Sequence, residues 1–517
     1  MKSMKRVLAL VLAMVMCLGL ATVAMAADNA TITVENSAKG ETYTLYKLFN
    51  ASVTGDEDGS IVYTGSIPSG LTKYFTTNAS GNIEATSDAK GSEEGSISNE
   101  LRAYLNDTWV KSSEANDYRQ VGPTAGTGGR LEFKNLPYGY YVLVSTQGNA
   151  TAVSVNSTNP NATMYDKNDE LPKFNHDSVP ATGKFVNGQE SAKVSVGDTV
   201  TYTITFQAAN YNGKGENAQL IRTYTVSDTL PKWLENVTIQ SVQYSEKANE
   251  DGTYTYTNMP TSDYNATDFA TNKTITFSWL NDGVPKYDNG TLVTITYTAK
   301  VGVGAEDQTI TYGTDGNVNT ATLAWTDVTN GNGSLESKAT IYTYEFDLVK
   351  TGPSAKDADN NDTGVYTLLS GAKFKLFTDE ACTKGITLDT NNVVSNASEN
   401  AEATEFEVTD GKITVKGLKD GTYYLQETVA PAGYNKMAGT KELTITDNNL
   451  TATGLSGQTY TSTTETNGGG VHIINNSGTE LPSTGGIGTT IFYVIGGILV
   501  IGAGVLLVTK KRMAHHD

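Results

Sequence analysis

The sequence predicts an all-β protein in which three β-sandwich domains follow one another between two targeting segments. Threonine-rich runs that alternate apolar and polar residues recur along the chain, and Asn-Gly or Asp-Gly turns separate several of them. Long helical periodicity is almost absent from the middle of the chain. The 517 residues suffice for about three domains of ordinary size, each with its own core.

The composition argues against several classes of function. The formal net charge of -19 disfavours binding to nucleic acid or to anionic lipid. Of the two cysteines, Cys17 lies in the predicted signal, so the mature chain keeps only Cys382 and forms no internal disulfide. The four histidines leave little material for a zinc site or a histidine-based active site. We therefore expect no metal, no cofactor and no enzymatic activity on a separate substrate.

The N-terminus has the pattern of a secretory signal peptide, expected at 1–26. Three cations among the first six residues precede an apolar run from 7 to 23, and Ala24-Met25-Ala26 supplies the small residues that signal peptidase prefers. A lipoprotein signal at Cys17 is the alternative. The bulky Met16 before it disfavours that interpretation.

The C-terminal segment, 481–517, has three parts in a fixed order: a pentapeptide, an apolar stretch at 491–508 and a short basic tail. The pentapeptide consists of Leu481, Pro482, Ser483, Thr484 and Gly485. The apolar stretch is long enough to span a bilayer. This order resembles the LPXTG sorting signal of Gram-positive wall proteins, and the resemblance implies that a sortase cleaves after Thr484 and transfers it to an amine. The alternative is a single-pass membrane protein with a chance pentapeptide.

The alternating runs place the domains between these segments. We expect a first domain at 27–172 with one short helix, a second at 173–344 and a third at 345–480. Four apolar residues at helical spacing predict the helix, namely Ile97, Leu101, Tyr104 and Leu105. The segment 171–184 has two prolines and no clean period, which indicates an interdomain linker.

Strand alternation in the third domain places a polar residue on three otherwise apolar faces. These faces are Phe346, Leu348 and Lys350; Tyr423, Leu425 and Glu427; and Val471, Ile473 and Asn475. A lone buried charge would cost several kcal/mol. Burial lowers the pKa of a lysine and raises that of a glutamate, so a neutral amine and a protonated acid can lie together beside an amide. Lys350 could then attack the side-chain carbonyl of Asn475 while Glu427 polarises it, giving an isopeptide bond.

A longer motif supports this chemistry by resemblance. The segment 423–434, Tyr-Tyr-Leu-Gln-Glu-Thr-Val-Ala-Pro-Ala-Gly-Tyr, looks like the E-box of collagen-adhesin B-type domains, which carry the lysine first and the asparagine last. An exposed edge-strand salt bridge between Lys350 and Glu427 is the alternative.

The second domain has a similar set of residues. One face carries Tyr224, Val226 and Asp228, and another carries Asn319, Ala321 and Leu323. The segment 225–231 resembles the aspartate strand of collagen-adhesin A-type domains, which implies an isopeptide bond between Lys184 and Asn319 with Asp228 as the acid. Two rivals for the lysine, Lys173 and Lys193, stay open, and Asp228 could instead close a turn.

The first domain shows an inward-facing Lys47 beside Leu45 and Phe49, but the matching strand at 139–144 supplies no acid. We expect no efficient bond there. A lysine that extends its amine to solvent at a sheet edge is the favoured interpretation.

The end of the first domain carries a candidate nucleophile for polymerisation. Met164-Tyr165-Asp166-Lys167-Asn168 resembles the tyrosine-proline-lysine-asparagine pilin motif of Spa-type major pilins, with Asp166 in place of the proline. The resemblance implies that Lys167 accepts Thr484 of the next subunit. An ordinary solvent-facing lysine is the alternative.

Taken together, the motifs resemble a Spa-type, isopeptide-forming backbone pilin with three Ig-like sandwiches. The resemblance implies a secreted shaft subunit of a pilus, anchored to peptidoglycan on a Gram-positive cell. Expected partners are a sortase and identical subunits, with accessory pilins and host or microbial surface ligands in cell adhesion. A monomeric wall-anchored adhesin and a basal pilin are the alternatives. The only catalysis expected is formation of the chain's own isopeptide bonds.

Overall fold

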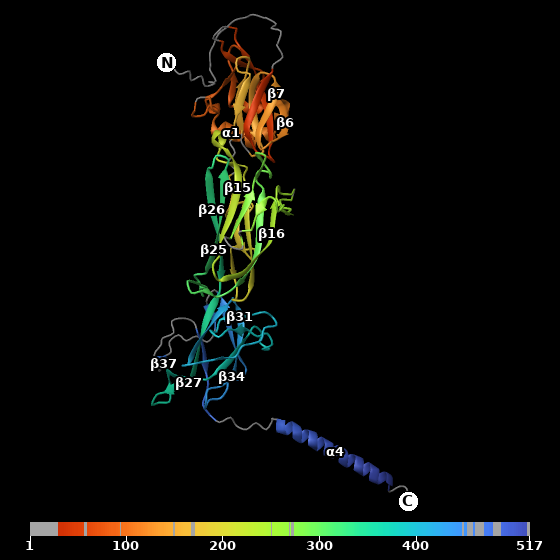
Figure 1. Cartoon of the computed structure of the whole chain (residues 1–517), viewed down its shortest axis with the longest axis vertical. Helices are drawn as coiled ribbons and strands as arrows, with labels where there is room; N and C mark the ends of the chain where they lie inside the picture. The colour runs from red at the N-terminus through yellow and green to blue at the C-terminus, as the bar shows by residue number, and fades with distance from the viewer. Residues whose placement is uncertain are drawn as a thin grey trace. The chain divides into compact units, whose positions relative to one another are not determined.

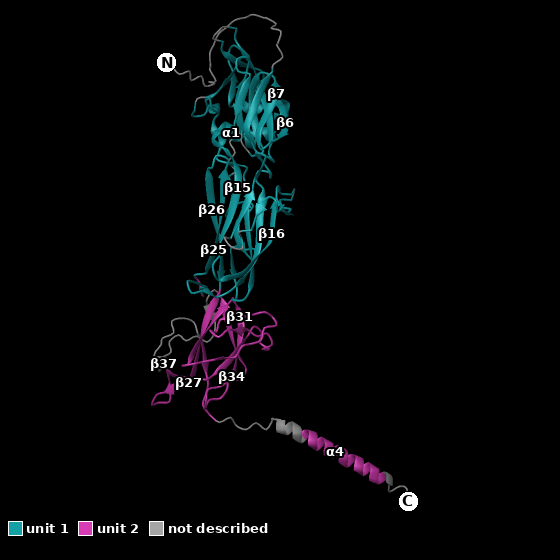
Figure 2. Cartoon of the chain, in the orientation of Figure 1, with its two compact units in different colours: residues 1–311, 315–342 teal, residues 312–314, 343–517 magenta. Residues whose placement is uncertain are grey.

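Strands dominate the structure, a computed structural model, so the predicted all-β class is confirmed (Figure 1). The described residues are 29–55, 59–93, 95–147, 150–166, 171–249, 251–267, 269, 273–446, 449–451, 459–460, 470–478 and 487–513. They form two compact units (Figure 2). Unit 1 comprises 1–311 and 315–342, and unit 2 comprises 312–314 and 343–517. The three-domain division stays a prediction.

The first part of unit 1 contains two main sheets. One has the order β10-β1-β7, with β10 at Asn161–Met164, β1 at Ala30–Ser37 and β7 at Gly129–Leu136. The other has the order β3-β2-β8-β9, and β6 also pairs with β2: β3 is Ile61–Thr64, β2 Thr42–Val53, β8 Gly139–Ser145, β9 Ala150–Val155 and β6 Arg119–Ala125. A small hairpin joins β4 (Phe75–Thr77) to β5 (Ile83–Ala85).

The predicted helix is α1, Asn99–Asp107, and a short α2 follows at Ala115–Tyr118. Ser98 caps α1, because its hydroxyl accepts a hydrogen bond from the backbone N–H of Leu101 at 3.1 Å. Leu101 and Leu105 are buried on one face, as the spacing predicts.

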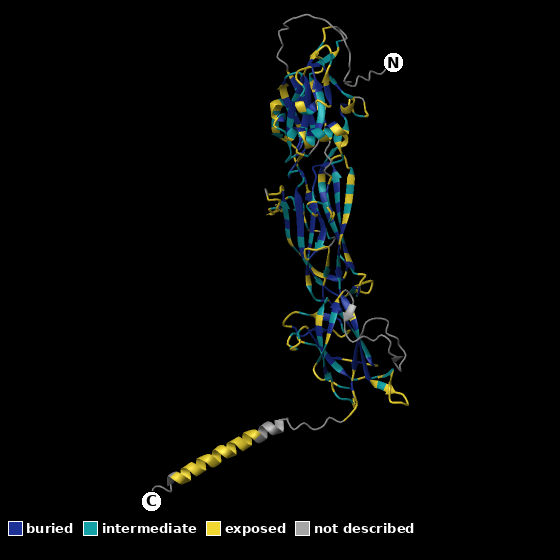
Figure 3. Ribbon diagram, turned by 180° about the vertical axis from the view of Figure 1, so that it is seen from behind, coloured by how far each residue is buried: buried dark blue, intermediate teal, exposed yellow. Residues whose placement is uncertain are grey.

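The second part of unit 1 has two larger sheets, whose inward faces are buried (Figure 3). The first has the order β11 (Gly183–Val186), β13 (Thr199–Gln207), β22 (Leu292–Val301), β16 (Leu234–Ser245) and β17 (Thr257–Asn258). The second has the order β12 (Ser191–Lys193), β26 (Asn332–Tyr342), β25 (Asn317–Asp327), β15 (Gln219–Thr229), β19 (Thr274–Ser278) and β18 (Tyr264–Asn265), and β14 (Tyr211–Asn212) pairs with β15. Two small hairpins are β20 (Leu280–Asn281) with β21 (Val284–Pro285), and β23 (Gly304–Ala305) with β24 (Gln308–Thr309).

The segment expected as a linker is packed in the structure. Lys173 forms a two-way main-chain bridge with Gln207, and Phe174 is buried. Thr182 is also buried, and its N–H donates to the carbonyl of Asn175 at 3.0 Å. The segment is therefore packed onto the sheets, and its role as a connection between domains stays a prediction.

Unit 2 contains two five-stranded sheets. In the first, β27 (Tyr344–Lys356) pairs with β33 (Lys412–Leu418), with β38 (Gly470–Ile474) and with β28 (Asp362–Leu368), which pairs with β37 (Thr459–Tyr460). The second has the order β32 (Phe406–Glu407), β29 (Lys373–Phe377), β34 (Gly421–Val429), β35 (Thr440–Thr446) and β36 (Asn449–Thr451). A small hairpin joins β30 (Thr387–Leu388) to β31 (Val394–Asn396). The first and last long strands, β27 and β38, lie side by side in parallel.

Helix α4, Ile487–Met513, follows. Its part from Tyr493 to Lys511 is long and apolar enough to cross a membrane, close to the predicted span. The signal peptide, the pentapeptide 481–485 and Lys167 lie outside the described residues.

A seam of hydrogen bonds joins the two parts of unit 1. The N–H of Lys39 donates to Asn210 Oδ1 at 3.0 Å, and its carbonyl accepts from the N–H of Asn289 at 2.7 Å. The hydroxyl of Tyr211 donates to the carbonyl of Ser37 at 3.2 Å. The chain therefore bonds directly across this seam.

We expect Gly40→Ala to lower the free energy of unfolding by about 1–3 kcal/mol more than Gly188→Ala. Both glycines have positive φ, +84° and +78°, so both substitutions carry a backbone cost of about 1–2 kcal/mol. A β-carbon on Gly40 would lie 2.5 Å from Asp288 Cβ at the seam, whereas Gly188 has open space around it. Urea unfolding measures the difference, and equal losses would contradict the close packing.

Candidate functional site

The first candidate site lies between the two sheets of the second part of unit 1. Lys184 is on β11 in one sheet, and Asp228 on β15 and Asn319 on β25 are in the other. Their exposed fractions are 0%, 3% and 0%. Asp228 pairs with Ala321 across the strands, and Asn319 lies two residues before Ala321, so alternation turns both side chains to the same interior.

Tyr297 on β22 connects the three side chains. Its hydroxyl donates to Asp228 Oδ2 at 2.6 Å and accepts from Lys184 Nζ at 2.9 Å and Asn319 Nδ2 at 3.0 Å. Lys184 Nζ also donates to Asp228 Oδ2. Asp228 Oδ1 and Asn319 Oδ1 are buried and accept no hydrogen bond from the described residues. The amine, the acid and the amide thus share one dry cluster.

The surroundings of Lys184 shift its amine toward the neutral form. Burial lowers the pKa of Lys184 to about 8, and the neighbouring charge of Asp228 opposes that shift. The amine lies 5.0 Å from the ring centre of Tyr202 and 5.4 Å from that of Tyr297. Burial also raises the pKa of Tyr297 well above its usual value, and the Asp228 charge adds to this. Tyr297 therefore stays protonated and can donate to the acid.

The structure selects among the lysines that the sequence left open. Lys173 bridges the main chain of Gln207, and Lys193 is exposed on the edge strand β12, whereas Lys184 contacts Asp228. Asp228 is a buried strand residue, so the alternative in which it only closes a turn is contradicted.

Tyr297 was missed in the sequence. It lies on the same face as Val293 and Ile295, which are buried. The alternation at 292–297 could have indicated an inward hydroxyl, which requires a hydrogen-bond partner.

The second candidate site lies between the two sheets of unit 2. Lys350 is on β27, Glu427 is on β34 of the facing sheet, and Asn475 directly follows β38. Their exposed fractions are 0%, 1% and 2%, so the alternative of an exposed salt bridge is contradicted. Asn475 Nδ2 donates to Glu427 Oε1 at 2.9 Å and Oε2 at 3.0 Å.

The amine of Lys350 hydrogen-bonds to main-chain carbonyls that lie next to Asn475. Its Nζ donates to the carbonyl of Ile473, two residues before Asn475, at 3.2 Å and to that of Thr351 at 3.3 Å. Burial lowers the pKa of Lys350 to about 8, against an opposing effect of the Glu427 charge. Asn475 Oδ1 is buried and accepts no hydrogen bond from the described residues.

The position of the acid differs from the sequence expectation in one respect. Glu427 was expected to polarise the carbonyl of Asn475, but it faces the amide nitrogen, Nδ2. In unit 1, the amide nitrogen of Asn319 likewise faces Tyr297, which bonds to Asp228. In both sites the acid is therefore connected by hydrogen bonds to the amide nitrogen and not to the carbonyl oxygen.

His472 is a further buried residue that sequence reasoning missed. Its Nε2 lies 2.7 Å from Thr351 Oγ1, and its ring meets Tyr366 edge-on at 4.9 Å. Burial, and then the charge of Lys350, lower the pKa of His472 to about 4. It therefore stays neutral beside the lysine. Its place in the strand 471–475, next to the inward Val471 and Ile473, gave no signal of burial.

The first part of unit 1 places its lysine and its acid differently. Lys47 is half-buried and pairs with Tyr141 across the strands. The buried acid is Asp166, whose Oδ2 accepts from the Tyr43 hydroxyl at 2.8 Å and whose N–H donates to Asn36 Oδ1 at 2.7 Å. The expectation that Lys47 forms no bond stays a prediction.

Two family models and a curated relative match this chain. Residues 356–459 match the SpaA family, described as a prealbumin-like fold domain, and residues 473–515 match the LPXTG cell wall anchor motif. The trypsin-resistant surface T6 protein of Streptococcus pyogenes serotype M6 is 24% identical over 550 residues, covering 94% of this chain and 96% of that protein.

Solved structures of pilus proteins are also similar. The group B streptococcus pilus 2b backbone protein is 28% identical, covers 58% of this chain and 100% of its own, and gives a TM-score of 0.41. BcpA, the major pilin subunit of Bacillus cereus, is 16% identical, covers 87% of this chain and 100% of its own, and gives a TM-score of 0.36.

We expect the mature protein to be lighter than its sequence by two molecules of ammonia, because each site can join an amine to an amide. Asp228→Ala and Glu427→Ala should each restore one ammonia and lower the free energy of unfolding by about 4–5 kcal/mol, the loop-closure value for a cross-link of this span. Intact-mass spectrometry and chemical unfolding measure both effects. Glu442→Ala, an exposed acid on the neighbouring strand β35, is the matched control. A wild-type mass equal to the sequence mass would contradict both bonds.

Bond formation should accelerate as pH rises through about 8 and then level off. Only the neutral amine attacks, and the pKa values of Lys184 and Lys350 are lowered to about 8 in the folded chain, so protonation blocks attack below that value. Chains isolated from inclusion bodies in urea, before any bond has formed, are diluted into buffers of different pH, and cross-linked peptides are quantified with time. A rate that is flat across this range would contradict attack by these amines.

Proposed function

We infer how this chain is cross-linked and joined to its neighbours. The premise is that it is a Gram-positive, LPXTG-anchored surface protein of the backbone-pilin type, a sortase substrate that forms a pilus shaft. The predicted family and cell-wall location are thereby confirmed. The residues that join and stabilise the subunits are the proposal.

Each buried site forms one isopeptide bond without help from another protein. The neutral Nζ of the lysine attacks Cγ of the asparagine, a new C–N bond forms, and the bond from Cγ to Nδ2 breaks. The lysine's proton passes to the departing nitrogen, which leaves as ammonia, and the acid carries that proton. Atoms and charge balance, and the product is an uncharged amide that suits a dry interior. The observation that carries the proposal is the burial of lysine, acid and asparagine together in both units.

Tyr297 relays the proton in unit 1. Its hydroxyl lies between Asp228 and the amide nitrogen of Asn319, at 2.6 Å and 3.0 Å. Glu427 needs no relay, because it contacts the nitrogen of Asn475 directly at 2.9 Å. These acids act once, on their own chain, which is self-modification and not turnover of a separate substrate.

Covalent bonds at these places suit a subunit under tension. In unit 2 the bond would join β27 to the residue after β38, strands that pair in parallel. Parallel strands pulled from opposite ends shear all their hydrogen bonds together, whereas a covalent bond carries the force itself. Each bond closes a loop of more than a hundred residues, and such a loop stabilises a fold by about 4–5 kcal/mol.

Subunits are joined through Thr484 of one chain and Lys167 of the next. Support comes from the residue before the lysine: Asp166 is buried and bonded to Asn36 and Tyr43, which fixes the chain at this point. Sortase, peptidoglycan and identical subunits are the partners. Accessory pilins and host or microbial ligands would act in cell adhesion.

Lys167→Ala should abolish the ladder of covalent polymers in wall extracts. The variant removes the accepting amine but leaves Thr484 free to reach peptidoglycan, so a monomer band should remain. An SDS immunoblot of extracts from the native host measures this, with Lys90→Ala, an exposed lysine of the same part of unit 1, as the matched control. A single band in the parent would indicate a monomeric adhesin or a basal pilin, and a ladder in both strains would move the nucleophile elsewhere, with Lys173 next.

A further inference from the structure

The backbone of Lys184 is held by two side chains rather than by neighbouring strands on both sides. Its N–H donates to Ser337 Oγ at 2.9 Å, and its carbonyl oxygen lies 2.8 Å from His176 Nε2. Strand β11 is the edge of its sheet, and β13 is the strand of that sheet beside it among the described residues. The two main-chain groups of Lys184 that face away from β13 thus meet Ser337 and His176.

The backbone of the other site lysine, Lys350, is held by main-chain hydrogen bonds instead. Lys350 lies on β27, inside its sheet, and its N–H donates to the carbonyl of Gly411 at 2.8 Å. Its carbonyl accepts from the N–H of Leu369 at 2.9 Å. Main-chain neighbours therefore fix Lys350, whereas Lys184 on an edge strand depends on side chains.

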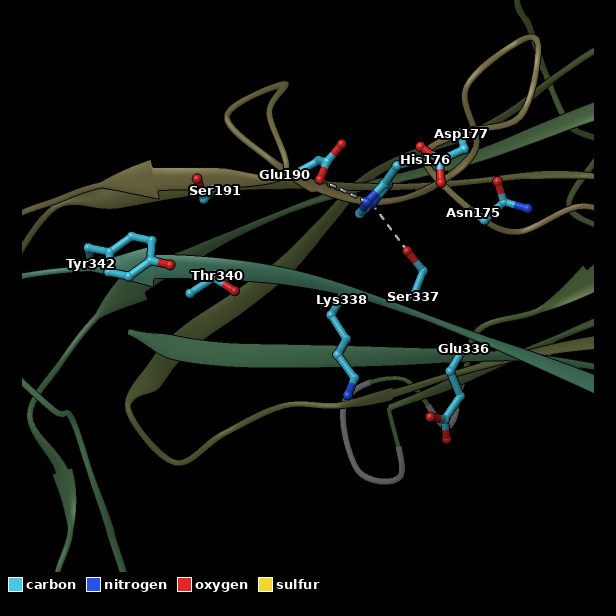
Figure 4. Close-up of a pocket in the computed structure, with 10 residues that line it drawn as sticks. All are labelled: Asn175, His176, Asp177, Glu190, Ser191, Glu336, Ser337, Lys338, Thr340 and Tyr342. Carbon is cyan, nitrogen blue, oxygen red and sulfur yellow. Dashed lines mark hydrogen bonds and ion pairs between the residues drawn. The ribbon is translucent and has the colours of Figure 1, made fainter. Parts of the chain in front are cut away.

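Figure 4 shows His176 between Glu190 and Ser337. This arrangement resembles a hydrolytic triad with Ser337 as nucleophile, His176 as base and Glu190 as acid. The distances are 3.3 Å from His176 Nδ1 to Glu190 Oε2 and 3.2 Å from Nε2 to Ser337 Oγ. However, Nε2 faces the carbonyl of Lys184, which only accepts, so this nitrogen carries a proton and donates it there. It has no lone pair to take the proton of Ser337, so the group is not a hydrolytic triad.

Gly183 allows both side chains to approach. Its φ is +112°, and a β-carbon there would lie 2.5 Å from Ser337 Oγ and 2.8 Å from His176 Cδ2. The loop before it folds back through Asn175 and Thr182, whose main chains are hydrogen-bonded at 3.0 Å, and this returns His176 to Lys184. The glycine at position 183, the loop before it and the side chains of His176 and Ser337 therefore all lie around the backbone of Lys184.

We propose that His176 and Ser337, with Gly183, form a clamp that positions Lys184 for attack on Asn319; this rests on the isopeptide bond proposed above. Ser337 is on β26, which pairs with β25, the strand of Asn319. The clamp therefore ties the strand of the nucleophile to the sheet of the electrophile. A lysine side chain has many rotamers, so a fixed Cα is needed to keep the amine within attacking distance. His176 and Ser337 are positioning residues, since neither touches the reacting atoms.

His176→Ala and Ser337→Ala should each slow formation of the 184–319 bond about tenfold. The full chain is isolated from inclusion bodies in urea before any bond has formed and is then diluted, samples are quenched at intervals, and the 184–319 and 350–475 cross-linked peptides are quantified by mass spectrometry. The 350–475 bond, in the other unit of the same molecules, should form at the wild-type rate. His176→Gln should restore the 184–319 rate, because the glutamine amide donates like Nε2 but transfers no proton.

Two controls separate positioning from folding. Ser245→Ala, another buried serine of the same sheets, should leave both rates unchanged. In the Asp228→Ala background, where no 184–319 bond forms, tryptophan fluorescence should show that the clamp variants refold as fast as their parent.

The outcomes distinguish the clamp from the bond. A wild-type rate in both alanine variants would overturn the clamp, as would equal slowing of the two bonds or of refolding. If His176→Gln does not restore the rate, the positioning role of His176 is wrong and a role in proton transfer replaces it. Absence of the 184–319 peptide in wild type would instead refute the proposed bond itself.

Discussion

The structure of both candidate sites depends on one constraint: a lysine amine is enclosed between two sheets where water does not reach it. A charged amine in such a place is costly, and burial lowers the pKa of both Lys184 and Lys350 to about 8. The cost falls if the amine becomes part of a neutral amide. The unreacted cluster is therefore less favourable than the cross-linked product that we propose. The acid and the asparagine beside the amine are the groups that this reaction requires.

The two sites meet this constraint with different surroundings. In unit 1 the amine lies beside two tyrosine rings, and the hydroxyl of Tyr297 connects it to Asp228 and Asn319. In unit 2 the amine rests on main-chain carbonyls, and Glu427 meets the amide of Asn475 directly. The hydroxyl of Tyr297 thus connects the shorter acid, Asp228, to the amide of Asn319, whereas the longer acid, Glu427, contacts the amide of Asn475 without a connecting group.

Strand alternation predicted a large part of both sites. The faces that end in Lys350, Glu427 and Asn475 are buried as the period of two requires, and so are those that contain Asp228 and Asn319. The packing of the segment 171–184 could not be predicted, because Phe174 and Thr182 are buried through long-range contacts that a local pattern of prolines does not contain. Tyr297 was missed because its sequence context is an ordinary apolar strand.

The sequence by itself determined the fold class, the buried faces of the site strands and the C-terminal anchor segment, because these follow from local periodicity and from short contiguous motifs. Only the tertiary structure decided that Lys184, and not Lys173 or Lys193, meets Asp228, and that His176 and Ser337 hold its backbone. Those contacts join residues that are far apart in the chain and depend on how two sheets face each other. Strand periodicity fixes which way a side chain points, but only the packing of the sheets fixes what it meets.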